Sequence, residues 1–245
     1  MTLFLAAIAW IFDPAAHSGQ NALPTRIAEH LGYTFGAVLI AAVIALPAGY
    51  LIGHTGRGRE LAVSFTGGMR ALPSLGILIL FALGLGIGFK APLLAFVILA
   101  IPPLLAGAYA GIEAIDRLTI DAARAVGMTE WQILVTVEIP LGMPLLIGGI
   151  RAGVLQVVAT ATLAAYVGGG ALGGYIFHGI STKNYIEMLG ASIVVTALAL
   201  VLEGLFSVTQ KAVVPHGVSA GRAKMVRVRP SRPRTAVTYP IEKGK

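Results

Sequence analysis

The chain has 245 residues, of which 56% are hydrophobic and only 12% are charged. Soluble domains average about 25% charged residues, so the composition excludes an ordinary soluble domain. The net charge of +7 does not indicate a nucleic-acid partner, because from Lys211 onward nine basic residues and one acidic residue give +8 and leave −1 for the rest. We expect 211–245 to be a disordered, basic cytoplasmic tail that lies near anionic lipid or binds a specific partner.

The chain begins with an apolar segment that has two possible placements. Met1–Phe12 is short for a membrane span and lacks the basic leading region of a secretory signal peptide. The N-terminal segment 1–32 is therefore expected to add either a tilted extra transmembrane helix or an interfacial or re-entrant segment.

Five later stretches are apolar enough to cross a bilayer, which takes about 20 residues of helix. Three of them carry no charge and two carry one charge each. They are Tyr33–Gly53, Ala71–Phe89, Ala91–Ile112, Ile139–Phe177 with Arg151, and Met188–Gln210 with Glu203. We therefore expect an all-α polytopic membrane protein, with a transmembrane domain over 33–210 and about five to six transmembrane helices.

The basic residues give the chain an orientation. If the first certain span is entered at Tyr33 from outside, thirteen of the eighteen basic residues are cytoplasmic and three are external. Long tails count less in this rule, and without the tail the bias falls to four against three. The polar segment 116–140 is accordingly expected on the cytoplasmic side.

This polar segment has the punctuation of two short helices. Asp116 is placed to cap a first helix that runs to about Val126, and Gly127 supplies the left-handed residue that ends helices. Thr129-Glu130-Trp131-Gln132 then fits a capping box. The second helix is expected to run to about Glu138, with Pro140 at its end.

The hairpin has two interpretations from its residues alone. It is either an ordinary loop hairpin packed on its own bundle or a surface that receives another protein. Small residues at Ala122, Ala123 and Gly127 favour the second interpretation, because they permit close approach of another backbone.

A motif runs through both helices of the hairpin. It consists of Asp121-Ala122-Ala123, then Gly127, then Val137-Glu138-Ile139-Pro140. It resembles the "EAA" motif of bacterial ABC-importer permeases, which is Glu-Ala-Ala, three residues, Gly, nine residues and Ile-x-Leu-Pro. The departures (Asp for Glu, Val for Ile, Ile for Leu) are conservative. The resemblance implies a type I ABC-importer-like permease core, whose hairpin docks into a groove of a separate ATPase. Asp121, Ala122, Ala123, Gly127 and Pro140 would then be the coupling residues.

Further motifs between about 29 and 208 resemble permeases that import osmoprotectants such as glycine betaine, carnitine, choline and proline. They are Glu29-His30-Leu31, Leu72-Pro73-Ser74-Leu75, Gly127-Met128-Thr129, Gly149-Ile150-Arg151, Ala159–Ala165 and Gly168–Gly173. The resemblance implies a pair of ATPase subunits that carry ATP and Mg, an external solute-binding protein, and a second permease copy or a related permease. It implies no cofactor on this chain and a place in the bacterial inner membrane.

Three charges are expected to lie within the membrane. Arg70, Arg151 and Glu203 lie roughly 14, 16 and 12 Å from the inner face if each stretch is helical. Charges at such depth are costly and usually face a bundle interior or a water-filled path. We expect Glu203 to pair with an arginine, most simply Arg151, and a fixed ion pair is favoured over direct contact with a solute.

A glycine cluster lies near the outer end of a span, at Gly168, Gly169, Gly170 and Gly173. No Gly-Lys-Ser/Thr follows it, so it does not fit a phosphate-binding loop. It is interpreted either as a flexible break or as a gate that bends during transport.

Other function classes have less support from the sequence. No catalytic set and no metal-binding His-Glu-x-x-His pattern occurs, so neither an enzyme nor a metal site is expected. A permease for methionine, phosphonate or another small solute stays open. A secondary transporter or channel, for which the hairpin would be a mere loop, is the remaining alternative, although no internal repeat supports it.

Overall fold

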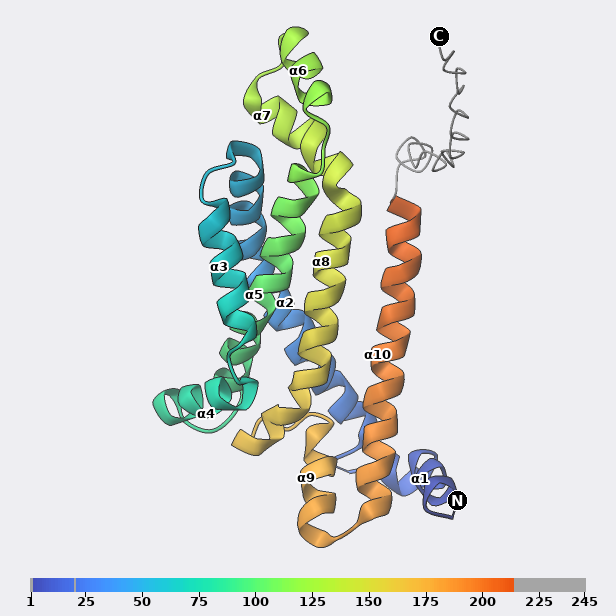
Figure 1. The fold of residues 1–245 in the computed structure, drawn as a ribbon. Helices are drawn as coiled ribbons and strands as arrows, with labels where there is room; N and C mark the ends of the chain where they lie inside the picture. The colour runs from blue at the N-terminus through green and yellow to red at the C-terminus, as the bar shows by residue number, and fades with distance from the viewer. Residues whose placement is uncertain (1, 20, 214–245) are drawn as a thin grey trace, which may run out of the picture. The chain divides into compact units, whose positions relative to one another are not determined.

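The computed structural model describes residues 2–19 and 21–213, and within them the chain is almost entirely helical (Figure 1). The α-helices are α1 (Thr2–Ile11), α2 (Leu23–Thr55), α3 (Arg59–Arg70), α4 (Ser74–Leu85), α5 (Lys90–Glu113), α6 (Arg117–Ala125), α7 (Glu130–Ile133), α8 (Ile139–Thr160), α9 (Gly173–Thr182) and α10 (Tyr185–Val213). Short segments of other helix types are η1 (Pro14–His17), η2 (Leu134–Glu138) and η3 (Ala161–Val167). Most of the expected basic tail lies outside the described residues, and only 211–213 are seen, where they continue α10.

Four helical segments are long and apolar enough to cross a bilayer, and a bent pair adds a fifth candidate. They are α2, α5, the stretch Glu130–Val167, α10, and α3 with α4. The expected polytopic helical fold is therefore confirmed. The helix α1 has 10 residues, about 15 Å of length against a hydrocarbon core of about 30 Å. It is too short to cross as an α-helix, and it packs against α10 through Trp10, which lies beside Gly190.

The expected single span over 71–89 is wrong. The helix α3 ends at Arg70, α4 begins at Ser74, and their axes differ by 87°. Pro73 explains the break, because proline lacks a backbone N–H and disfavours the helical conformation of the residue before it. The stretch that hydropathy joins into one span thus contains the connection after α3, the whole of α4 and the residues that follow α4.

The first long helix starts ten residues earlier than its hydropathy suggests, at Leu23 instead of Tyr33. Proline is favoured in the first turn of a helix, where its missing N–H is not needed, and Pro24 occupies that turn. The early turns carry Arg26 and Glu29, which ended the apolar run in the sequence but not the helix. The boundary expected at residue 32 therefore falls inside α2.

The core is formed by α2, α5 and α8, with α5 between the other two (Figure 1). Small residues let these backbones come close, as is usual between membrane helices. A Cβ atom added to Gly107 of α5 would lie 2.7 Å from the Cα of Gly149 in α8. His30, fully buried on α2, has its Nε2 atom 2.9 Å from the carbonyl oxygen of Val158 in α8. These contacts fix the three helices as one packed unit.

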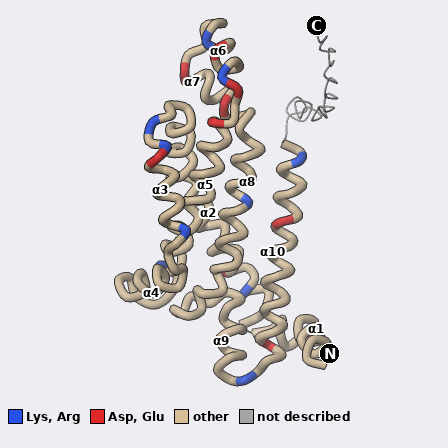
Figure 2. The backbone as a smooth tube through the Cα atoms, viewed as in Figure 1, with Lys and Arg blue, Asp and Glu red and all other residues tan. Residues whose placement is uncertain are grey.

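The remaining surface of the long helices is largely apolar, whereas charges gather at one end. Leu39 and Val43 on α2, Leu83 on α4 and Val208 on α10 are all exposed. Exposed apolar surface of this extent indicates contact with lipid or with another protein. Figure 2 shows the charged residues concentrated on α6, α7 and the start of α3, with few along the long helices.

Candidate functional site

The first helix of the hairpin is closed at both ends by local hydrogen bonds. Asp116 accepts a hydrogen bond at 3.0 Å from the N–H of Leu118, which caps α6. At the other end the N–H of Met128 donates to the carbonyl oxygen of Ala123 at 3.2 Å. Gly127 has a φ of +87°, a conformation in which other residues are strained. The expected cap and left-handed terminator are both present.

The second helix opens with the expected capping box. The N–H of Thr129 donates to Oε1 of Gln132 at 2.8 Å, and the N–H of Gln132 donates to Oγ1 of Thr129 at 3.3 Å. Each side chain thus satisfies a backbone donor of the other residue.

The end expected for this helix at Pro140 is not there. Helix α7 passes through the π turn η2 into α8, so that one helical stretch runs from Glu130 to Thr160. In the π turn the N–H of Ile139 donates to the carbonyl oxygen of Leu134, five residues back. Such a wide turn accommodates the missing N–H of Pro140 without ending the helix. The hairpin is therefore continuous with a membrane-spanning helix.

The small residues of the motif lie in two different environments. Ala123 is buried against Ile120 and Ile133, so its size is needed inside the hairpin. Ala122 and Gly127 are exposed instead. Ala122 belongs to an apolar stripe on α6, formed with Leu118 and Val126, of which 74% and 79% are exposed. The stripe is the part of the hairpin against which another protein can pack.

A chain of charged groups ties the hairpin to α2. Arg124 donates from Nε to Oε1 of Glu130 at 2.8 Å and contacts Asp121 at 3.4 Å. Its hydrogen bonds to Glu130 raise the pKa of Arg124 above the ordinary value. His54, near the end of α2, lies 3.4 Å from Glu130 and 2.6 Å from the buried carboxylate of Glu138. The turn of the hairpin is thus connected to two spanning helices.

The sequence interpretation missed His54 and Glu138 as partners. A signal for Glu138 was available, because a single acid inside the apolar stretch Leu134–Ile139 needs a partner when it is buried. Nothing in the spacing identified that partner, since His54 lies 84 positions away in the chain.

Two of the three intramembrane charges lie together. Arg151 of α8 donates from Nε to Oε2 of Glu203 in α10 at 2.6 Å, and from Nη1 to Gln210 at 3.3 Å. The pair that the sequence favoured therefore joins α8 to α10. Arg70 is not in this cluster. It lines a separate cavity at the break between α3 and α4.

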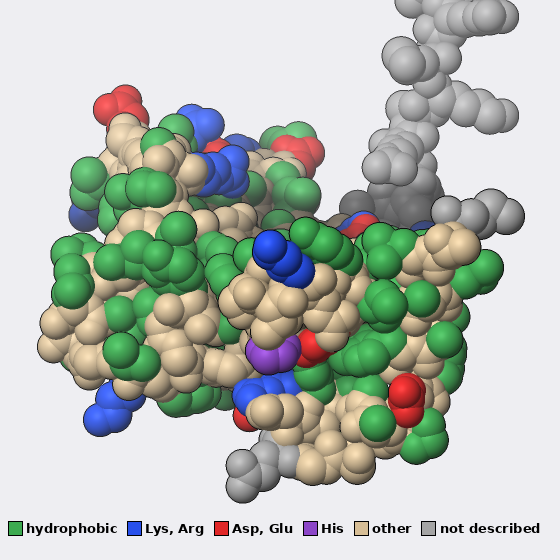
Figure 3. Space-filling model, turned by 90° about the horizontal axis from the view of Figure 1, so that it is seen from below, with side chains coloured by type: hydrophobic (Ala, Val, Ile, Leu, Met, Phe, Trp, Pro, Cys, Tyr) green, Lys and Arg blue, Asp and Glu red, His purple; other side chains and the backbone are tan. Residues whose placement is uncertain are grey.

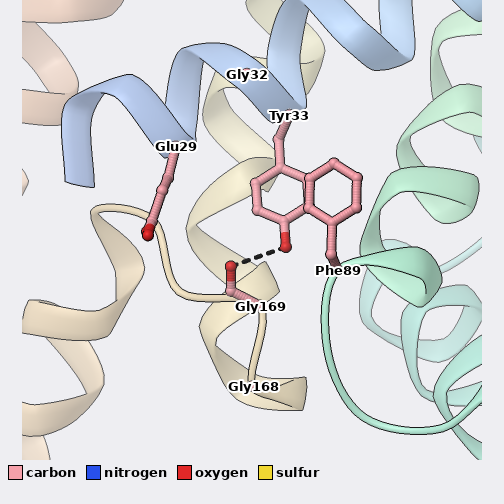
Figure 4. Close-up of a pocket in the computed structure, with 6 residues that line it drawn as sticks. All are labelled: Glu29, Gly32, Tyr33, Phe89, Gly168 and Gly169. Atoms are coloured by element: carbon pink, nitrogen blue, oxygen red, sulfur yellow. Dashed lines mark hydrogen bonds between the residues drawn. The ribbon is translucent and has the colours of Figure 1, made fainter. Parts of the chain in front are cut away.

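At the opposite end from the hairpin, the glycine cluster forms a tight turn after η3. Gly168 and Gly170 have φ values of +74° and +71°. The hydroxyl of Tyr33 donates to the carbonyl oxygen of Gly169 at 2.8 Å (Figure 4). Glu29 accepts from the N–H of Ala171 at 2.9 Å. The turn is thus held against α2 by two side chains rather than left loose.

A cavity of about 320 Å³ adjoins this turn, lined by Glu29, Gly32, Tyr33, Phe89, Gly168 and Gly169 (Figure 4). The rings of Tyr33 and Phe89 are stacked with centroids 4.7 Å apart. Figure 3, which views this end, shows a histidine beside acidic and basic side chains near the middle, flanked by hydrophobic side chains. This end therefore combines a packed glycine turn with a polar surface.

These features define a helical membrane transport subunit. It has several spanning helices, one span that is broken beside a cavity, and a polar hairpin that is continuous with a spanning helix. The sequence matches the model of the family "Binding-protein-dependent transport system inner membrane component" over residues 41–216. The chain belongs to this family. It is a multi-pass permease subunit of an ATP-driven importer, which works with a separate ATPase and a solute-binding protein.

Individual proteins agree with the family. The glycine betaine/carnitine/choline transport system permease protein OpuCB of Bacillus subtilis is 32% identical over 79% of this chain and 89% of its own length. The carnitine transport permease protein OpuCB of Listeria monocytogenes is 33% identical over 84% of this chain and 94% of its own length. An inward-facing structure of the MetNI methionine ABC transporter superposes with a TM-score of 0.68 at 23% identity, covering 79% of this chain and 96% of that one. The last likeness concerns the fold alone.

Proposed function

We propose that this permease subunit imports compatible solutes of the kind named for its relatives: glycine betaine, carnitine, choline or proline. The two OpuCB permeases support the first three of these, and both align over most of their length. Proline rests only on the sequence resemblance. Of the alternative cargoes, methionine is supported only by the likeness of the fold to MetNI, at 23% identity, and phosphonate was suggested by the sequence alone.

The hairpin 116–140 is the proposed docking element for the ATPase. The observation that carries this proposal is the unbroken helical stretch from Glu130 to Thr160, because a helix transmits displacement along its length. The apolar stripe on α6 offers the contact surface, and Gly127 fixes its angle to α7. Asp121, Ala122 and Pro140 lie at the surface, whereas Ala123 is buried inside the hairpin. Movement of the docked hairpin would pull on α8 directly, and on α2 through His54 and Glu138.

The assembly proposed around the chain has three further parts. Two permeases, a second copy or a related chain, form the path at their shared interface. Two ATPase subunits carry ATP and Mg, and this chain binds no cofactor of its own. ATP binding closes the ATPases, moves the hairpins and opens the outer mouth to the binding protein, and hydrolysis reverses these steps. The glycine turn Gly168–Gly173 is the proposed outer gate, held closed by Tyr33 and Glu29.

Uptake measurements test the proposal. Cells with and without the gene are given labelled betaine, carnitine, choline and proline singly and in competing pairs, before and after ATP depletion. Gene-dependent, ATP-dependent uptake of at least one solute is expected, together with co-purification of an ATPase with the tagged chain. Uptake of none of the four, with uptake of methionine instead, would remove the proposed cargo.

One variant tests the docking role of the hairpin independently of which solute is carried. Gly127→Asp should abolish both ATPase co-purification and uptake while membrane insertion is preserved. Normal uptake by this variant would contradict the assigned role of the hairpin.

A further inference from the structure

The break between α3 and α4 opens into a cavity that the coupling hairpin and the outer gate do not use. Its volume is about 520 Å³, and α3, α4, α5 and α8 all contribute to its wall. Its polar groups are the guanidinium of Arg70, the hydroxyl of Ser74 and the side-chain amide of Gln156. Leu72, Leu99 and Pro103 are among its apolar neighbours. Polar groups that converge in a cavity with apolar walls are typical of a small-molecule site, and here the polar share of the wall is large.

Arg70 lies deep in the membrane. It is the last of the 12 residues of α3, about 16 Å along the helix from its start near the hairpin end. That is roughly half of the 30 Å hydrocarbon core. A cation at this depth is costly unless it has a partner or faces a water-filled path. Glu203 is already paired with Arg151, and among the described residues Arg70 forms no ion pair.

The start of α4 adds to the positive potential at the same place. Ser74 is the first residue of this 12-residue helix, and no side chain caps it because Pro73 precedes it. The first N–H groups of a helix carry the positive end of its dipole and favour an anion. The cavity therefore presents a positively charged guanidinium, hydroxyl and amide donors, and the positive end of a helix dipole. Its wall contains no acidic side chain among the described lining residues.

We propose that this cavity binds the carboxylate of the transported solute, with Arg70 as the anchoring residue and Ser74 and Gln156 as further hydrogen-bond donors. Guanidinium and carboxylate match in shape and make paired, charge-assisted hydrogen bonds. The inference rests on the proposed function and narrows it. It selects zwitterions with a carboxylate, such as betaine, carnitine and proline, over choline, which has a hydroxyl in its place.

Substitution of Arg70 tests whether its positive charge is needed for a solute with a carboxylate but not for one without. Uptake of labelled glycine betaine and labelled choline is measured for the complete transporter carrying wild-type chain, Arg70→Gln or Arg70→Lys. Loss of a charged hydrogen-bond partner corresponds to a change of about tenfold to a hundredfold. We expect Arg70→Gln to lower betaine uptake by that factor, Arg70→Lys to retain part of it, and any choline uptake to change less than about twofold. Equal loss for betaine and choline would overturn the proposal.

The matched control is Arg57→Gln. Arg57 lies just before α3, is exposed and is outside the cavity, so its replacement removes the same charge from the same region. It should leave betaine uptake unchanged. Copy number in the membrane and ATPase co-purification are measured for every variant, so that lost assembly is not mistaken for lost binding.

A labelling experiment gives an answer that does not depend on which solute is imported. The chain contains no cysteine, so Ala152→Cys introduces a single thiol into the cavity wall and leaves Arg70 in place. In proteoliposomes with the partner ATPase, a water-soluble thiol reagent should modify this variant, and a carboxylate solute such as betaine or acetate should slow the reaction more than choline does. In a second variant, Arg70→Cys, the anchor itself is removed. A reagent that leaves a cationic group there should restore betaine uptake in part, and an anionic reagent should not.

The outcomes separate the two proposals. No reaction at position 152, or equal slowing by choline and betaine, would overturn the carboxylate site. If wild-type chain imports none of the four solutes but the thiol is modified and protected by acetate, the cargo proposal fails and the anion site stands.

Discussion

The hairpin end and the glycine-rich end of this permease are both built from short helical pieces, yet different kinds of contact hold them. At the hairpin the capping bonds and the ion pairs of Arg124 join residues within six positions of each other. At the opposite end, the two bonds that fix the glycine turn join residues 136 and 142 positions apart. The first end can form from its own segment, whereas the second exists only when α2 is in place.

This difference suits the two proposed roles. A lever must move as one body, and the hairpin has its own small core of Ile120, Ala123 and Ile133 together with a helix that continues into α8. A gate must open without unfolding, and the glycine turn is tied to α2 by side-chain bonds that can be broken singly. Each exchange of a hydrogen bond with water costs only about 1 kcal/mol.

The largest effect is expected where the hairpin's own core is overfilled. Ala123→Trp puts a large ring between α6 and α7, and overpacking of a tight core costs about 1–3 kcal/mol. We expect uptake to fall at least about tenfold and the hairpin to become sensitive to protease. Protease digestion of membrane vesicles, with uptake in the same cells, measures both.

The neighbouring residue provides the comparison. Ala122→Trp places the same ring on the exposed stripe, where the hairpin itself can accommodate it. It should lose ATPase co-purification while protease resistance stays normal. If Ala122→Trp were as protease-sensitive as Ala123→Trp, the division between a core face and a docking face would be wrong.

An effect on stability, without loss of the docking surface, is expected at the packed start of α9. A methyl group on Gly173 would collide with the carbonyl oxygen of Thr162, so Gly173→Ala forces η3 and α9 apart. The next residue, Gly174, has no atom within 4 Å of an added Cβ. We expect Gly173→Ala to destabilise the purified permease by about 1–3 kcal/mol, and Gly174→Ala to be neutral or slightly stabilising because alanine favours a helix. Equal thermal stability of the two variants would show that this end is loosely packed after all.

The sequence predicted the hairpin end better than the glycine-rich end, because the contacts of the hairpin are mostly local in the chain. Asp116, Gly127 and the Thr129–Gln132 box act through neighbours in the chain, so their pattern alone predicts the helix ends. Hydropathy likewise located α5 and α10 nearly to their ends. The Arg151–Glu203 pair was accessible because charges of opposite sign at similar depth in a membrane have few other partners.

Two prolines show what local pattern does not decide. Pro73 was placed within one expected span and instead separates two helices, whereas Pro140 was expected to end a helix and lies within one. Proline removes one donor in either case, and tertiary packing determines whether the chain bends or widens a turn. The ties from Tyr33 and Glu29 to the glycine turn were equally inaccessible, since no spacing relates residues so far apart.

The smallest effect is expected from loosening the gate without disturbing its packing. Tyr33→Phe keeps the buried ring and its stacking on Phe89 but removes the hydroxyl that donates to Gly169. One neutral hydrogen bond is worth about 0.5–1.5 kcal/mol, so the closed state should lose roughly two- to tenfold in population. Because a more open gate depends less on the binding protein, we expect ATPase activity without that protein to rise by a similar factor. Tyr166→Phe, which alters an exposed ring, is the control. An unchanged basal rate in Tyr33→Phe would mean that the turn is held by its packing, as the hairpin is, and the contrast between the two ends would disappear.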